Sequence, residues 1–172
     1  ESMSNYDKQS FANLYFGTYI DAQKLPWHYL PVWIGLTTPI MVLVLFPLGL
    51  VSTFLMKNNW WNEERRMDIH VLIFFLFPFS YIILTKPVLY DGWRHMYFLY
   101  ISILYFAVMA IYWFLNSSIR LSGSIKTIIV VIVLIIGFIR PVHFIIRHHP
   151  FQYVFFNNLM SSSRLENEFE KD

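Results

Sequence analysis

The chain has 172 residues, of which 56% are hydrophobic, 20% aromatic and only 14% charged. Soluble domains carry about 25% charged residues, so this chain has too few charges to coat a soluble core. The net charge of +2 is small and the basic residues form no dense patch, which argues against a nucleic-acid partner. The absence of cysteine excludes disulfides and thiolate metal sites.

The two ends of the sequence are polar. The N-terminal residues stay polar through Gln9 and lack the basic-then-apolar layout of a signal peptide. The stretch from Arg164 to Asp172 is charged and contains no closing apolar element. We therefore expect the sequence to be a piece of a longer protein.

Four apolar runs dominate the sequence: Leu30–Met56, Ile69–Thr85, Met96–Leu115 and Thr127–Ile146. Each run is close to the roughly 20 residues needed to cross a hydrocarbon core. Backbone polar groups inside lipid must be bonded within the segment, so each run should be a helix. Pro39, Pro47 and Pro78 should kink their helices, because proline removes a donor and clashes with the preceding turn. We predict an all-α polytopic membrane protein with about four transmembrane helices and short loops.

The predicted organisation has three parts: an external juxtamembrane segment (1–29), a four-helix transmembrane region (30–147) and an external polar tail (148–172). Four spans place both ends of the chain on one side of the membrane. The loops 57–68 and 116–126 are basic and would be cytoplasmic by the positive-inside tendency, although the opposite face also carries basic residues. We interpret residues 60–66 as a solvated interfacial turn and residues 116–124 as a simple connector.

The predicted external face concentrates cationic, histidine and aromatic side chains. They lie at 24–29, at 86–95 and at 147–153. Arginine offers a bidentate fork to phosphate oxygens, and aromatic rings offer a stacking wall, so this face suits a phosphate-bearing amphiphile. The alternative for Lys86 is that a basic side chain near a helix end simply reaches for lipid headgroups.

Arg140 follows a strongly apolar run and precedes Pro141. If it lies within the membrane it should face a partner or a wet cavity, because a buried charge there is costly. His143, three residues on, would share its helix face. If instead the span ends at Ile139, Arg140 lies at the interface, and the sequence leaves both alternatives open.

Three segments in order resemble motifs of a known family. They are Tyr15–Gly17 with Leu25–Val32 and Thr37–Pro39, then Gly92–Phe98, then His149–Asn157. Together they resemble bacterial polytopic glycosyltransferases of the C-type superfamily, which includes protein O-mannosyltransferases and the aminoarabinose transferase of lipid A. Thr37 departs from the family pattern, which has lysine there.

The resemblance implies transfer of a sugar from a polyprenyl-phosphate carrier to a lipid or protein acceptor. Such enzymes work on the periplasmic face of the bacterial inner membrane. Their catalytic acidic residue lies in an external loop that would precede this chain, so the resemblance implies a C-terminal membrane half of such an enzyme or a divergent non-catalytic relative. The expected partners are membrane lipid, the polyprenyl-phosphate-linked sugar, and the missing N-terminal half or other membrane subunits.

Under this resemblance, site residues can be assigned by position. The candidates for the carrier phosphate are Lys86, Arg94 and His95. The candidates for the sugar or acceptor pocket are His28, Tyr29, Asp91, Tyr97 and His149. The catalytic residue itself stays unknown. A divalent metal is left open as a cofactor, although no His-x-x-x-His or Glu-x-x-His pair supports zinc or di-iron binding.

Two other functions compete with the enzyme. A non-catalytic subunit that scaffolds or anchors a larger complex would also be aromatic and rich in apolar helices. In that case the cationic residues of the external face should point separately to solvent rather than converge on one cavity. A transporter ranks lowest, because only Arg140 and His143 offer polar groups within a span.

Overall fold

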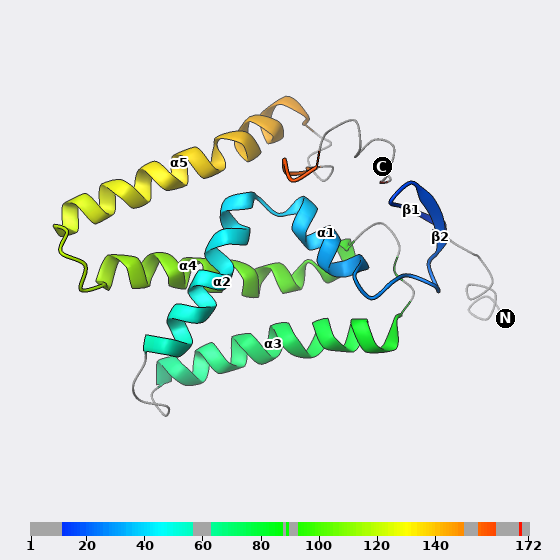
Figure 1. Ribbon diagram of the computed structural model, residues 1–172, viewed down its shortest axis with the longest axis horizontal. Helices are drawn as coiled ribbons and strands as arrows, with labels where there is room; N and C mark the ends of the chain where they lie inside the picture. Colours follow the sequence, from blue (N-terminus) through cyan, green and yellow to red (C-terminus); the bar gives the residue numbers. More distant parts are fainter. Residues whose placement is uncertain are drawn as a thin grey trace.

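The computed structural model describes residues 12–56, 63–87, 89, 93–149, 155–160 and 169. Two short strands come first, followed by helices arranged lengthwise (Figure 1). The elements are β1 (Ala12–Tyr15), β2 (Thr18–Asp21), α1 (Tyr29–Thr37), α2 (Ile40–Met56), α3 (Glu63–Thr85), the 3-10 helix η2 (Arg94–Met96), α4 (Phe98–Asn116) and α5 (Gly123–Arg147).

The predicted helical membrane fold is confirmed. Three helices are long and apolar enough to span a membrane: Arg65–Thr85, Phe98–Asn116 and Gly123–Arg147. The pair α1 and α2 passes the same test together, although the two helices are bent by 116° at their junction. Within the described residues, helix length and composition thus allow three membrane spans, or up to four if the bent pair counts as one.

The first apolar run does not form one continuous helix, contrary to the prediction. Thr38 is extended, with φ −86° and ψ 136°, and α1 ends at Thr37. The residue before a proline is pushed out of the helical region, so Pro39 separates α1 from α2. Pro47 and Pro78 lie inside α2 and α3, which continue through them.

A β-hairpin within the predicted juxtamembrane segment was not expected. β1 and β2 pair antiparallel, with Tyr15 opposite Thr18. The two loop residues have positive φ, 49° at Phe16 and 75° at Gly17. Two-residue loops with positive φ at both positions suit the right-handed twist of paired strands, so the backbone here forms a tight hairpin turn.

α2 packs mainly on α4, and the two backbones approach closely at Gly49. A Cβ built on Gly49 would overlap the backbone carbonyl of Phe106. Ser52 on α2 and Ser102 on α4 are also buried. Small residues let membrane helices approach closely, so this contact fixes α2 against α4.

Two cations predicted to lie in plain loops are buried instead. Arg65 is fully buried and donates to the carbonyls of Thr53 (2.6 Å) and Phe54 (3.3 Å). The prediction of a solvated turn at 60–66 is therefore wrong for Arg65. Lys126 is 5% exposed and donates to the carbonyl of Ser117. Both cations cover the C-terminal end of the preceding helix, where carbonyls lack intrahelical partners.

A carboxylate is buried close to Arg65 in the chain. Asp68, one turn along α3, is fully buried and accepts a hydrogen bond of 2.7 Å from the Tyr105 hydroxyl of α4. A buried charged side chain is costly unless it is hydrogen-bonded. Arg65 bonds to α2 and Asp68 bonds to α4, so the start of α3 is attached to both helices.

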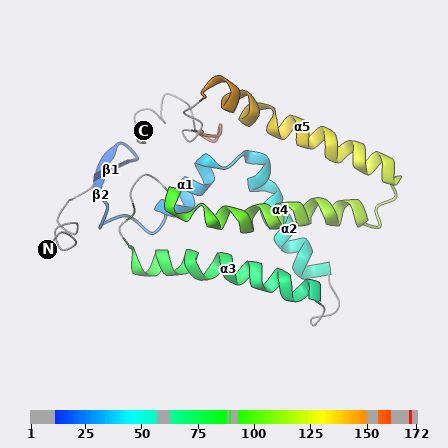
Figure 2. The ribbon, with the colours of Figure 1, turned by 180° about the vertical axis from the view of Figure 1, so that it is seen from behind.

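The elements predicted to share one face gather at one end of the molecule. β1, β2, α1, η2 and the C-terminal turn of α5 lie together there, which we call the hairpin end (Figures 1 and 2). The start of α3 and the connection between α4 and α5 lie at the opposite end (Figures 1 and 2).

Replacing Gly49 by alanine should lower the free energy of unfolding by about 1–3 kcal/mol, because the new methyl group meets rigid backbone. Gly35→Ala is the matched control, since a Cβ there meets nothing within 4 Å. Thermal unfolding of the purified protein in detergent compares the two variants. Equal midpoints would contradict the close α2–α4 contact.

Replacing Arg65 by alanine should cost about 1.5–3 kcal/mol, the range for hydrogen bonds to a charged group. The neighbouring Arg66→Ala is the control, because Arg66 is exposed. Surface substitutions usually change stability by less than about 0.5 kcal/mol. Denaturation midpoints measure the stability of both variants. An equal loss of stability in the two would argue against Arg65 covering the end of α2.

Candidate functional site: a cationic cavity beside α5

An aromatic cluster fills the hairpin end. The ring of Tyr15 lies 5.1 Å from Tyr29 and 5.7 Å from Phe169, and the ring of Trp33 lies 5.7 Å from Phe156. Burial raises the pKa of Tyr15 to about 12. Aromatic pairs at these centroid distances attract each other beyond their burial, so the cluster joins the hairpin, α1 and the C-terminal segment.

Two long-range hydrogen bonds connect the hairpin end further. The Asn13 side chain donates to the carbonyl of Leu89 at 3.0 Å, which links β1 to the chain between α3 and η2. The buried Trp93 indole donates to the Thr37 hydroxyl at 2.7 Å, which links that same chain to α1. The segments that carry the predicted site residues are thus held together by specific contacts.

Lys86 and Tyr29 lie beside the same small crevice. Trp27 and Pro26 also line it, and its volume is only about 20 Å³. Binding sites for small molecules are roughly 300–1,000 Å³, so this crevice is too small for a sugar or a phosphate group with its chain. Lys86 has a φ of 47°, a left-handed conformation at the end of α3 that is unusual for a residue with a side chain.

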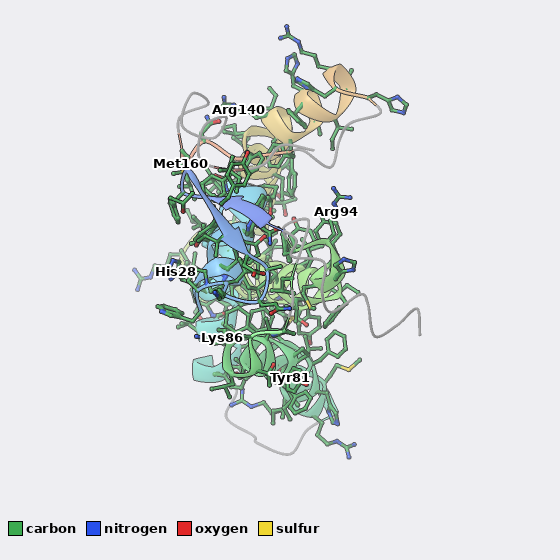
Figure 3. The ribbon with its side chains drawn as sticks, turned by 90° about the vertical axis from the view of Figure 1, so that its right-hand side faces the viewer. His28, Tyr81, Lys86, Arg94, Arg140 and Met160 are labelled. Atoms are coloured by element: carbon green, nitrogen blue, oxygen red, sulfur yellow. The ribbon has the colours of Figure 1, made fainter. Side chains whose placement is uncertain are left out.

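His28 and Arg94 do not come together. His28 is half-buried just before α1, with its ring 5.7 Å from Tyr15 and 5.5 Å from Trp27. Figure 3 places His28 and Arg94 on opposite sides of the molecule, and Arg140 apart from both. The predicted residues therefore share an end of the molecule without converging on one point.

Arg94, His95 and Tyr97 form a separate exposed group at η2. Burial raises the pKa of Tyr97, while the neighbouring Arg94 charge lowers it, so the two side chains are close enough to interact. Asp91 lies outside the described residues, and His149 is exposed just beyond α5. Within the described part of the chain, none of Arg94, His95 and His149 lines the crevice beside Lys86 or either of the two larger cavities along α5.

The larger of these two cavities, about 800 Å³ in volume, lies beside the C-terminal half of α5. Its other walls are the α1–α2 corner at Pro39–Met41 and the segment 155–158. Four cationic or titratable side chains line it: Arg140, His143, Arg147 and His148. No carboxylate is present among its described lining residues, so no described side chain of the wall neutralises Arg140 or Arg147.

The four side chains share one face because α5 does not end at Arg140. The helix continues through Pro141 to Arg147, whereas the position of Arg140 relative to the end of the membrane span stays a prediction. Spacings of three, four and seven residues repeat on one helix face, which places Arg140, His143 and Arg147 in one row. The side chains of all three residues are exposed.

His148 is held in a fixed orientation at the end of this row. Its ring stacks on Phe144, with centroids 4.2 Å apart and planes 18° apart. Its Nδ1 lies 3.1 Å from the Phe144 carbonyl, which can only accept, so Nδ1 carries a hydrogen.

Asn157 fixes the wall opposite α5. Its backbone N–H donates to the Leu36 carbonyl at 2.7 Å. Its side-chain amide donates to the carbonyls of Gly35 at 2.5 Å and Thr38 at 2.6 Å. These are the carbonyls at the end of α1, so one asparagine both covers the helix end and closes the cavity.

The cavity combines a cationic wall with apolar surroundings. Two arginines offer planar forks that match phosphate oxygens, and the histidines add donors. Ile136, Ile139 and Phe155 supply apolar surface beside them. This combination suits the phosphate end of an amphiphile. The sequence singled out Arg140 and His143. It did not show that Arg147 lies on the same face of one continuous helix, with His148 directly after it.

Metal-binding residues and similar proteins were the two remaining indications of function to consider for this site. Among the described residues, no group of three or more His, Asp or Glu side chains is placed to hold a metal ion. Comparison with known proteins found no matching family model, no curated relative and no similar solved structure.

Replacing Asn157 by alanine should destabilise the hairpin end by about 1–3 kcal/mol, because two helix-end carbonyls lose their donor. Asn158→Ala is the control, since Asn158 is exposed on the same segment. The expected readout is faster proteolysis after α5 in the Asn157 variant alone. Identical cleavage of both variants would show that Asn157 does not hold the wall.

Proposed function

We propose that this chain is the C-terminal membrane part of a glycosyltransferase that uses a polyprenyl-phosphate-linked sugar. It binds the carrier phosphate in the cavity beside α5. The transfer moves the sugar to a lipid or protein acceptor on the periplasmic face of the bacterial inner membrane. The observation that supports this proposal is the row of Arg140, His143 and Arg147 on a membrane-length helix, with His148 directly after it, lining a cavity with apolar walls.

The chemistry of the transfer explains why such a row is needed. When the sugar leaves its carrier, negative charge develops on the lipid phosphate. Cations placed at that position stabilise the developing charge, and stabilisation of this kind is often the main contribution to catalysis. In the proposal, Arg140 and Arg147 hold the phosphate. The acidic residue that activates the acceptor belongs to a part of the enzyme outside this chain.

The position of the cavity suits a ligand that stays in the membrane. A single helix carries both the apolar run Ile128–Ile136 and the cations that follow it. An amphiphile lying along α5 would therefore meet apolar surface with its chain and positive charge with its phosphate. In the proposal the hairpin end faces the periplasm, where the sugar would be transferred.

A scaffolding or anchoring subunit is the second candidate. The separation of Arg94 from His28 favours this candidate. The exposure of α5 favours it too, because 0% of the membrane-length window of this helix is buried inside the structure. A helix with this much exposed apolar surface would serve as a contact for another membrane subunit. This candidate predicts no specific affinity for a carrier phosphate.

Arg140→Ala and Arg147→Ala should each weaken binding of a polyprenyl phosphate about tenfold or more, because each removes charged hydrogen bonds. Arg120→Ala is the control, since Arg120 is exposed in the connection between α4 and α5 at the opposite end. The measurement is carrier affinity of the full chain in lipid nanodiscs.

Arg94→Ala belongs in the same series, because the resemblance assigns the phosphate to Arg94. Loss of affinity in Arg94→Ala, with normal affinity in both α5 variants, would move the carrier site to η2. Absence of any carrier binding by the unaltered chain would favour the scaffolding subunit.

A further inference from the structure

One residue of the charged stretch 164–172 is part of the core at the hairpin end. Phe169 is only 1% exposed. It forms an isolated antiparallel bridge with Tyr15 of β1. Because Tyr15 already pairs with Thr18 of β2, Phe169 lies along the other edge of β1, which the hairpin leaves open.

Four aromatic rings surround the ring of Phe169, and we call them the aromatic socket. Tyr15 and Phe16 come from the hairpin, with centroids 5.7 Å and 5.1 Å from that of Phe169. Trp33 of α1 lies at 5.6 Å, and Phe156 of the segment 155–160 lies at 6.5 Å. The planes of Tyr15 and Trp33 are inclined to Phe169 by 88° and 84°, the edge-to-face arrangement that aromatic pairs favour.

A pocket for one side chain beside an open strand edge is a common arrangement for binding peptides. Pairing with the strand edge supplies affinity, and the pocket supplies specificity for one side chain. In the sequence Phe169 stands between Glu168 and Glu170. The ligand that suits the socket is therefore a peptide that is polar apart from a single phenylalanine.

Phe156 connects the aromatic socket to the cationic cavity. It lines that cavity, and its ring also lies 5.7 Å from Trp33. The next residue, Asn157, attaches the same segment to the end of α1 by hydrogen bonds. The cavity wall at 155–158 is thus held at two neighbouring points. Because closely packed side chains leave little free volume, removing the Phe169 ring should loosen one of them.

We infer that the aromatic socket is a binding site for a peptide with one phenylalanine, filled here by Phe169, and that filling it positions the 155–158 wall of the cationic cavity. Phe169 is then a positioning residue, since it acts on the cavity through Phe156. The effect on carrier binding rests on the proposed function, whereas the effect on the wall does not.

The position of the wall can be measured directly with the full chain in lipid nanodiscs. The chain has no cysteine, so Asn158→Cys gives one site for a nitroxide spin label on an exposed residue of the wall. In the Phe169→Ala background the label should become more mobile. A synthetic peptide of residues 165–172 should restore its order, and the same peptide with alanine in place of phenylalanine should not. Tyr19→Ala is the control, because Tyr19 on β2 is 74% exposed.

Carrier affinity provides the second measurement. Phe169→Ala should weaken binding of polyprenyl phosphate about tenfold, within the range for a residue that acts on a site through a neighbour. The phenylalanine peptide should restore this affinity, which a general loss of folding would not allow. Phe169→Leu keeps an apolar side chain without the ring, so it should show both changes to a smaller extent.

The outcomes separate the inference from the function on which part of it rests. Unchanged label mobility in Phe169→Ala would overturn the positioning role. So would normal carrier affinity in Phe169→Ala when Arg140→Ala binds the carrier weakly. A mobile label that the phenylalanine peptide does not restore would overturn the socket as a peptide site. If the label responds as expected while the arginine variants bind the carrier normally, the proposed function fails and the socket stands.

Discussion

The fold depends on covering the carbonyls that are left at the end of each helix. Carbonyls buried at such an end cannot reach water, and leaving one unpaired costs free energy comparable to a lost hydrogen bond. The chain covers three such ends with side chains that come later in the sequence. Asn157 covers the end of α1, Arg65 that of α2 and Lys126 that of α4. Because each cap comes from a different element, satisfying the backbone also fixes how the elements pack.

The cap on α1 has the widest effect on the candidate site. α1 ends because Thr38 precedes Pro39, and the chain then turns by 116° into α2. That corner forms one wall of the cationic cavity, and Asn157 brings the second wall to the same carbonyls. A backbone break and an asparagine thus create a cavity beside α5 that neither helix would form alone.

The sequence predicted the spans well, because length and apolarity decide membrane crossing without tertiary information. It predicted a kink at Pro39 but not that the bend between α1 and α2 would reach 116°. It did not predict the hairpin, which depends on local backbone geometry that hydropathy does not register. The candidate site was only partly predictable. Arg140 and His143 stood out by position, but the row they form with Arg147 requires that α5 continue through Pro141. Lys86 and Arg94 share an end of the molecule, yet spacing along the chain does not encode the direction in which each points. Asp91 lies outside the described residues, so its assignment stays a prediction.

The burial of Arg65 and Lys126 bears on how the protein acquires its orientation during synthesis. The bias that keeps basic loops in the cytoplasm acts on each connection as it leaves the translocon, before the helices have packed. At that time both side chains count as loop charges. After assembly they are buried against helix ends and no longer contribute positive charge to that surface. In the predicted topology, the same two residues would act first as orientation signals and then as buried parts of the folded protein.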